Sequence, residues 1–202
     1  MDLISFLGIT GSLLDLVRAT PQLAHLMRAR KSFGVSVDTS GTICVVSLGW
    51  TAYGIITHQS FVALASGFMA SLFFLITLIA LWLGRSVREF RVAPIWLAAL
   101  FMAGASFGKT GLGLLLSISA LISNVPQIRV AYKEENLSGL SVGTWALTLL
   151  AGLTWFFYGF LQHDFTIMIS TFLQSATSVI IIALKIFKPV VEIVPSQDFV
   201  AD

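Results

Sequence analysis

Seven long apolar runs divide this sequence, and the breaks between them are short and contain charged or turn-forming residues. The runs cover about residues 3–27, 39–57, 61–83, 94–107, 111–131, 143–161 and 165–187. A helix needs about 20 apolar residues to cross a bilayer, and backbone groups inside lipid must be hydrogen-bonded within their own segment. The runs therefore predict an all-α integral membrane protein with seven transmembrane helices, of which the fourth is short.

Composition excludes the main alternatives. Only 11% of the residues are charged, whereas about a quarter are charged in a typical soluble domain. The alternation of a β-barrel, a basic stripe for nucleic acid and the basic start of a signal peptide are all missing. We find no metal-binding or nucleotide-binding motif and no nucleophile beside a base, so the sequence predicts neither an enzyme nor a cofactor. The single cysteine, Cys44, lies in an apolar run and is expected to pack there.

The placement of positive charge predicts the orientation. With the N-terminus outside, the outer segments hold only Lys109, and Arg18 lies inside the first span. The inner segments then hold ten cations: Arg28, Arg30, Lys31, Arg85, Arg88, Arg91, Arg129, Lys133, Lys185 and Lys188. Cytoplasmic loops carry the excess of Lys and Arg. We therefore expect an outer N-terminus, a cytoplasmic C-terminus and, in view of the short loops, a plasma membrane location.

The sequence repeats itself at an offset of 105 residues. Pro21-Gln22 aligns with Pro126-Gln127, Trp50 with Trp155, Tyr53-Gly54 with Tyr158-Gly159, and His58 with His163, all without a gap. The predicted units are a first three-helix repeat (1–87), a linker helix (88–108), a second three-helix repeat (109–188) and a cytoplasmic tail (189–202). One linker helix restores the direction of the chain, so the repeats are parallel. Transporters built in this way place their substrate site between the repeats.

Each repeat has a proline about two-thirds of the way along its first helix. Pro21 and Pro126 each remove a backbone hydrogen bond and are expected to kink the helix. The neighbouring Gln22 and Gln127 could satisfy the freed groups. We interpret these four residues as hinges, and a static bend is the alternative.

The second helix of each repeat carries an aromatic pair. Trp50 and Tyr53 are three residues apart and share a helix face with Ser47, and Trp155 with Tyr158 repeats the pattern. Flat aromatic rings suit the C–H face of a sugar. The alternative is an aromatic belt at the membrane interface, although Trp50 lies about 10 Å inside the expected helix end.

The first span contains two charged residues. Asp15 and Arg18 are three residues apart, so they can form an ion pair along one face of the helix. A proton-coupling role for Asp15 is the alternative. At the outer helix ends, His58, His163 and Asp164 are expected to be solvated loop residues, or else to sense external pH.

Together these motifs resemble the PQ-loop superfamily. The two Pro-Gln pairs, the Gly-x-Ser segments (Gly34–Ser36 and Gly139–Ser141) and the two Trp-x-x-Tyr-Gly groups are its pattern, and the SWEET-type sugar transporters are the branch that this chain is most similar to. The resemblance covers about residues 3–187. It implies a 3+1+3 fold and facilitative uniport of mono- and disaccharides by alternating access. It leaves open whether the chain forms a homo-oligomer.

The resemblance also implies roles for residues. Trp50 and Trp155 would flank the sugar pocket, Tyr53, Tyr158 and Asp164 would form the outer gate, and the prolines would be hinges. The family usually has an asparagine in the third helix of each repeat. Here the matching positions are near Ser66 and Thr171, with Gln174 one turn on. This difference keeps two alternatives open, which are proton-coupled transport of amino acids or another small polar solute, and a non-transporting receptor.

Overall fold

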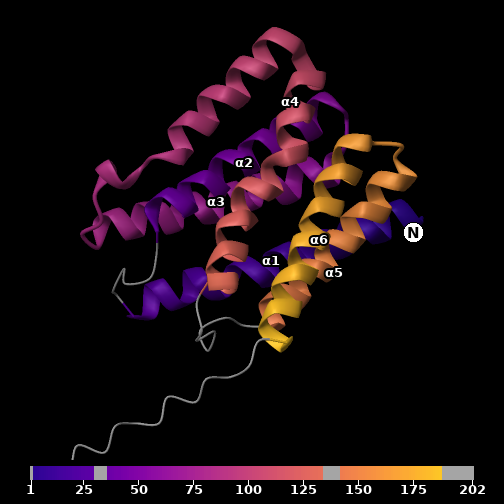
Figure 1. Cartoon of the computed structure of the whole chain (residues 1–202). Coiled ribbons are helices and arrows are strands. Elements are labelled where there is room, and N and C mark those ends of the chain that lie inside the picture. The colour runs from indigo at the N-terminus through magenta and orange to yellow at the C-terminus, as the bar shows by residue number, and fades with distance from the viewer. Residues whose placement is uncertain (1, 30–35, 134–141, 188–202) are drawn as a thin grey trace, which may run out of the picture.

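The computed structural model describes residues 2–29, 36–133 and 142–187. Its helices are α1 (Leu3–Ala29), α2 (Val37–Ile56), α3 (Ser60–Trp82), the short 3₁₀ helix η1 (Val87–Glu89), α4 (Val92–Lys133), α5 (Val142–Leu161) and α6 (Phe165–Phe187) (Figure 1). The described residues contain no strand, and the six α-helices are each long and apolar enough to cross a membrane. The predicted all-α membrane fold is confirmed.

Helix α4 contains two of the predicted spans. Its 42 residues are interrupted at Gly108, whose φ of 57° and ψ of −142° are not helical, and the ribbon turns sharply there (Figure 1). A positive φ is readily adopted by glycine because it has no Cβ atom. The break lies at residue 108, where the sequence predicted the end of the linker helix, so α4 spans the segments predicted as the linker helix and the first helix of the second repeat.

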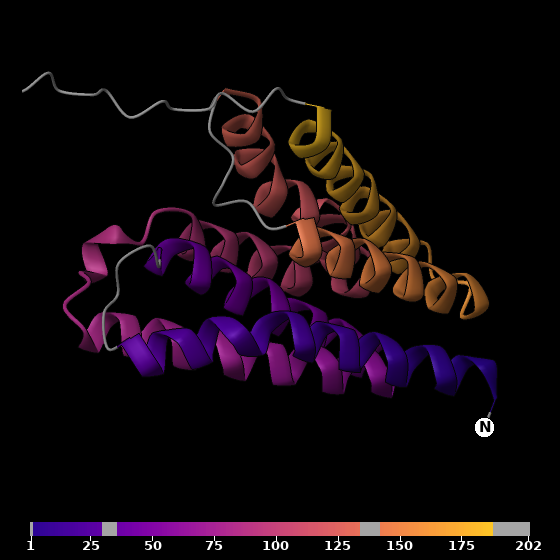
Figure 2. The same cartoon turned by 90° about the horizontal axis from the view of Figure 1, so that it is seen from below.

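The helices pack in the same order in both halves. Helix α3 contacts both α1 and α2, and α6 likewise contacts both α4 and α5. The halves are joined by α1 against α5 and by α2 against α4, which are equivalent contacts. Figure 2 shows α6 and the last part of α4 rising away from α1, α2 and α3 towards residues 133 and 187.

The turns that link the second and third helices show the repeat at the level of the backbone. His58 and His163 both have positive φ, at 58° and 54°. The N–H of Gln59 donates to the carbonyl of Gly54, and the N–H of Asp164 donates to that of Gly159, both at 2.8 Å. Residues 105 positions apart therefore make the same turn.

Asp38 fixes the start of the linker helix. Its Oδ1 accepts hydrogen bonds from the backbone N–H groups of Arg91, Val92 and Ala93 at 2.9 to 3.0 Å. The first N–H groups of a helix have no partner within the helix, and a carboxylate there is also favoured by the helix dipole. The first turn of α2 thus holds α4 against the first repeat.

The predicted hinges are described only in part. Helices α1 and α4 run through the positions of Pro21 and Pro126. The side chains of Pro21, Gln22, Pro126 and Gln127 lie outside the described residues, as do Gly34 and Val35 of the first Gly-x-Ser segment, the whole of the second segment and the tail from residue 188. The hinge role stays a prediction.

Candidate substrate site

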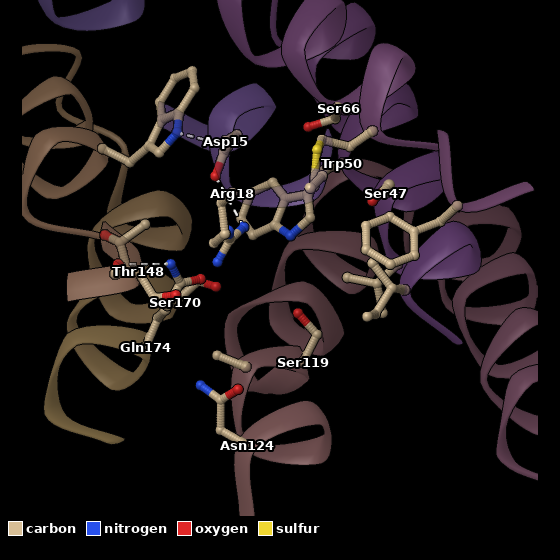
Figure 3. A pocket seen from close by; sticks show the side chains of 18 of the residues that line it. Asp15, Arg18, Ser47, Trp50, Ser66, Ser119, Asn124, Thr148, Ser170 and Gln174 are labelled. Carbon is tan, nitrogen blue, oxygen red and sulfur yellow. Dashed lines mark hydrogen bonds and ion pairs between the residues drawn. The ribbon is translucent and has the colours of Figure 1, made fainter. Parts of the chain in front are cut away.

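A cavity of about 340 Å³ lies between the two repeats, with walls from all six α-helices. This volume is at the lower end of the range of about 300–1,000 Å³ seen for ligand pockets, so the cavity fits a small solute. It is lined by every residue that the sequence assigned to substrate binding or to the charged pair: Trp50, Trp155, Ser47, Ser66, Thr171, Gln174, Asp15 and Arg18. Figure 3 shows Thr148, Ser170 and Gln174 on one side and Ser47, Trp50 and Ser66 on the other.

The two tryptophans enter the cavity from opposite repeats. Each packs edge-to-face on the tyrosine three residues later, with ring centroids 5.7 Å apart for Trp50 and Tyr53 and 5.2 Å apart for Trp155 and Tyr158. Such pairs are a favoured aromatic geometry. Since both indoles line the cavity, their position favours the binding interpretation over an aromatic belt.

Asp15 connects the repeats at the level of the tryptophans. Its Oδ1 accepts from Nη2 of Arg18 at 2.9 Å, and its Oδ2 accepts from Nε1 of Trp155, also at 2.9 Å (Figure 3). The ion pair predicted between Asp15 and Arg18 is therefore present. The bond to Trp155 was not predicted, and it ties α1 of the first repeat to α5 of the second.

Gly11 makes room for the Trp155 ring. A Cβ atom at Gly11 would lie 2.8 Å from Cε2 and 3.0 Å from Nε1 of Trp155, closer than such atoms can approach. Gly11 and Asp15 are one turn apart and together form the seat of this indole: Gly11 leaves space for the ring, and Asp15 accepts its hydrogen bond. The equivalent positions in the second repeat are Leu116 and Ala120, and Nε1 of Trp50 has no hydrogen bond to the described residues.

A hydrogen-bond network joins the repeats at one end of the cavity, and we call it the Asp164 network. The Tyr53 hydroxyl donates to the Asp164 carboxylate at 2.9 and 3.0 Å, and Nε2 of Gln59 donates to its Oδ2 at 2.6 Å. The N–H of Ile167 donates to Oδ1 at 3.1 Å.

The structure thus brings together two of the three predicted gate residues, Tyr53 and Asp164. The third, Tyr158, instead accepts a hydrogen bond from Gln162. The sequence analysis missed Gln59, although it aligns with Asp164 in the 105-residue register. His58 and His163 are exposed and line no part of the cavity, which favours their interpretation as solvated residues.

The sequence analysis also missed several polar cavity residues. Asn124, Ser119, Thr148 and Ser170 line the cavity, all from the second repeat's helices. The signal that could have found them is helical spacing, because Asn124 lies four residues after Ala120 on α4 and Ser170 and Gln174 share a face of α6.

Comparisons with known proteins agree with this geometry. The family model of the PQ loop repeat matches residues 110–168, which hold the second part of α4, all of α5 and the start of α6. No curated protein matches the chain. A solved structure of a eukaryotic SWEET transporter is similar at 17% identity, with a TM-score of 0.73 over 92% of this chain and 96% of that chain.

The six apolar helices define an integral membrane protein, in which residues 110–168 match the PQ loop repeat. More particularly, the chain has the SWEET fold over nearly its whole length.

Proposed function

We propose that this protein transports small sugars across a membrane by facilitated uniport. The observation that carries the proposal is the cavity between the repeats, which holds one tryptophan from each repeat and is bridged at one end by the Asp164 network. A SWEET transporter with the same fold supports a transport role.

The chemistry of the cavity suits a neutral polyol. Two indole rings offer flat apolar faces, while amide and hydroxyl groups from Asn124, Gln174 and Ser170 can both donate and accept hydrogen bonds. Asp15 and Arg18 are the only charged residues among the described cavity residues, and they neutralise each other. A solute with a net charge would have to break this pair or remain without a counter-charge in a partly desolvated site.

The predicted orientation indicates which side of the membrane each end of the cavity faces. Under the positive-inside orientation, the Asp164 network lies on the outer side, and the diverging ends of α1, α4 and α6 lie on the cytoplasmic side. We therefore assign this conformation to the inward-facing state, and we propose a plasma membrane location because the loops are short. Release of the Asp164 network together with closure of the opposite end would give the outward-facing state.

Counterflow of radiolabelled glucose and sucrose tests the proposal, in liposomes at equal inner and outer pH. Replacing Trp50 by alanine should lower glucose counterflow by about tenfold or more, which corresponds to about 1.4 kcal/mol of lost binding, because one aromatic face of the site is lost. Trp82→Ala is the matched control, since Trp82 is 80% exposed and lines no cavity. Full flux in well-inserted Trp50→Ala protein would reject the site.

A second candidate function is proton-coupled transport of amino acids. The charged pair inside the cavity favours it, because a guanidinium and a carboxylate can bind the two charges of a zwitterion.

This second candidate predicts that Asp15→Asn removes the pH dependence of uptake. The substitution takes away the titratable group but keeps an oxygen that can accept from Trp155. The pH dependence is measured as the uptake of radiolabelled amino acids under an imposed proton gradient. An unchanged pH profile in the variant would exclude Asp15 as the coupling residue.

A further inference from the structure

The two halves of the cavity differ in polarity at equivalent positions. In the 105-residue register Ala19 aligns with Asn124, Ile43 with Thr148 and Met69 with Gln174, and all six residues line the cavity. Every first-repeat member of these pairs is apolar and every second-repeat member is polar.

These three pairs lie in the part of the cavity remote from the Asp164 network. Ile43 lies ten residues before Tyr53 on α2, which corresponds to about 15 Å along a helix. Nearer the network Trp50 aligns with Trp155 and Ser66 with Thr171, whereas Asp15 aligns with Ala120 and is the polar member on the first-repeat side. Of these pairs, only the three formed by Ala19, Ile43 and Met69 have their polar member in the second repeat.

The second-repeat side keeps hydrogen-bonding capacity for a ligand. Nε2 of Gln174 donates to the Thr148 carbonyl at 3.4 Å, and Nδ2 of Asn124 donates to Oγ1 of Thr177 at 2.7 Å. The side-chain carbonyl oxygens of Gln174 and Asn124 make no hydrogen bond to the described residues, and each amide has a second N–H.

The three facing side chains, Ala19, Ile43 and Met69, offer no strong hydrogen-bonding group to a hydroxyl. Met69 is 7% exposed and Ala19 is 3% exposed, and Ile43 completes this wall. A hydroxyl placed against these side chains would lose its water without gaining a partner, which is unfavourable. A methyl or methylene group there would gain contact with the methionine thioether and the isoleucine side chain.

We propose that the transported solute is amphipathic, with a hydroxylated edge held by Asn124 and Gln174 and a deoxygenated or alkylated edge against Ile43 and Met69. This inference rests on the proposed sugar transport and narrows it. Within that class the preferred substrates are deoxyhexoses or methyl glycosides, and the fully hydroxylated hexose is a poorer substrate. Met69 sets the preference, and Gln174 holds the hydroxylated edge that glucose and these analogues share.

Competition against radiolabelled glucose counterflow tests the inference, with the monodeoxyglucoses and methyl glucosides as competitors. These differ from glucose by one oxygen or one methyl group. At least one of them should compete about fivefold to tenfold better than unlabelled glucose, the effect expected from relieving one unsatisfied hydroxyl. If unlabelled glucose competes as well as every one of them, the inference is overturned while sugar transport stands. Absence of counterflow for every sugar would instead reject the proposed function.

Two variants test whether the preference for a deoxy or methyl analogue over glucose depends on Met69. Met69→Gln supplies an amide at the position whose register partner, Gln174, has one. In this variant the best competitor and unlabelled glucose should compete about equally well. Met69→Leu keeps an apolar side chain of similar volume and should retain the preference. A preference that survives Met69→Gln would overturn the inference.

A third variant covers the case in which Met69→Gln does not fold. Gln174→Met removes a hydrogen bond from the edge that all the competitors share. It should weaken glucose and its deoxy analogues by similar factors, so that their ratio is unchanged. Loss of the preference in Gln174→Met would contradict the assignment of the apolar edge to Met69.

Discussion

Replacing Gly11 by leucine should reduce sugar counterflow by more than about tenfold. Even the Cβ atom of the new residue would lie 2.8 Å from Cε2 of Trp155, and the rest of the side chain needs further space. The indole is also hydrogen-bonded to Asp15, one turn further along α1, so moving away from Gly11 strains or breaks that bond. The displaced ring would leave the wall of the site and the Asp15 carboxylate would lose a donor.

Gly104→Leu is the control for this substitution, since an added Cβ at Gly104 meets no atom within 4 Å. Counterflow is compared at equal amounts of protein inserted in liposomes. If Gly11→Leu transports at the normal rate, then the position of the Trp155 ring does not matter for transport. A normal rate would thus contradict both the seat and the pocket assignment.

Replacing Gly54 by valine should lower stability strongly. A Cβ atom at Gly54 would lie 2.6 Å from the backbone nitrogen and 3.0 Å from the Cα atom of Ala63. Backbone atoms cannot rotate away as a side chain can, so α2 and α3 must separate. Overpacking of this kind costs about 1–3 kcal/mol and sometimes more, and we expect a clear fall in the thermal midpoint in detergent.

Gly67→Ala is the matched control, because it lies in the same helix pair but its new Cβ would be 3.6 Å from the Thr51 side chain, an ordinary contact. Alanine also favours helix over glycine by about 0.5–1 kcal/mol. The control should therefore unfold at the same temperature as the natural chain or higher. Equal midpoints for Gly54→Val and Gly67→Ala would show that the α2–α3 contact is not as close as described.

The helices could be predicted from the sequence because lipid permits few solutions. Once a run is apolar and about 20 residues long, its backbone must be helical. The predicted boundaries agree closely with the observed ones. The predicted run 61–83, for example, corresponds to the helix Ser60–Trp82. The break at Gly108 was also predictable, since glycine and lysine interrupt an otherwise apolar stretch.

Much of the site could be predicted from the repeat. If Trp50 faces the axis between the repeats, then Trp155 must face it too, and both line the cavity. Ser66 and Thr171, which also line it, were assigned from the family resemblance. The resemblance to the SWEET-type transporters added the roles.

The unpredicted contacts are those that break the repeat. The bond from Trp155 to Asp15 joins residues 140 positions apart, and its register partners Trp50 and Ala120 have no counterpart to it. The polarity of Asn124 against Ala19 could be read from the sequence, but its meaning needed both residues to be seen in one cavity. Symmetry predicts where side chains meet, and it does not predict how two unlike side chains will pair.

The meeting of Gln59 with Asp164 bears on how such a chain can evolve. These residues occupy equivalent positions and touch each other directly, so in a symmetric pair of identical repeats this position would face its own copy. Two copies of the second repeat would oppose two carboxylates, and two copies of the first would oppose two amides. Joining the repeats in one polypeptide allows an amide donor to face a carboxylate acceptor. The two halves are consequently no longer interchangeable, and a substitution on one side of the axis restricts what the other side can accept.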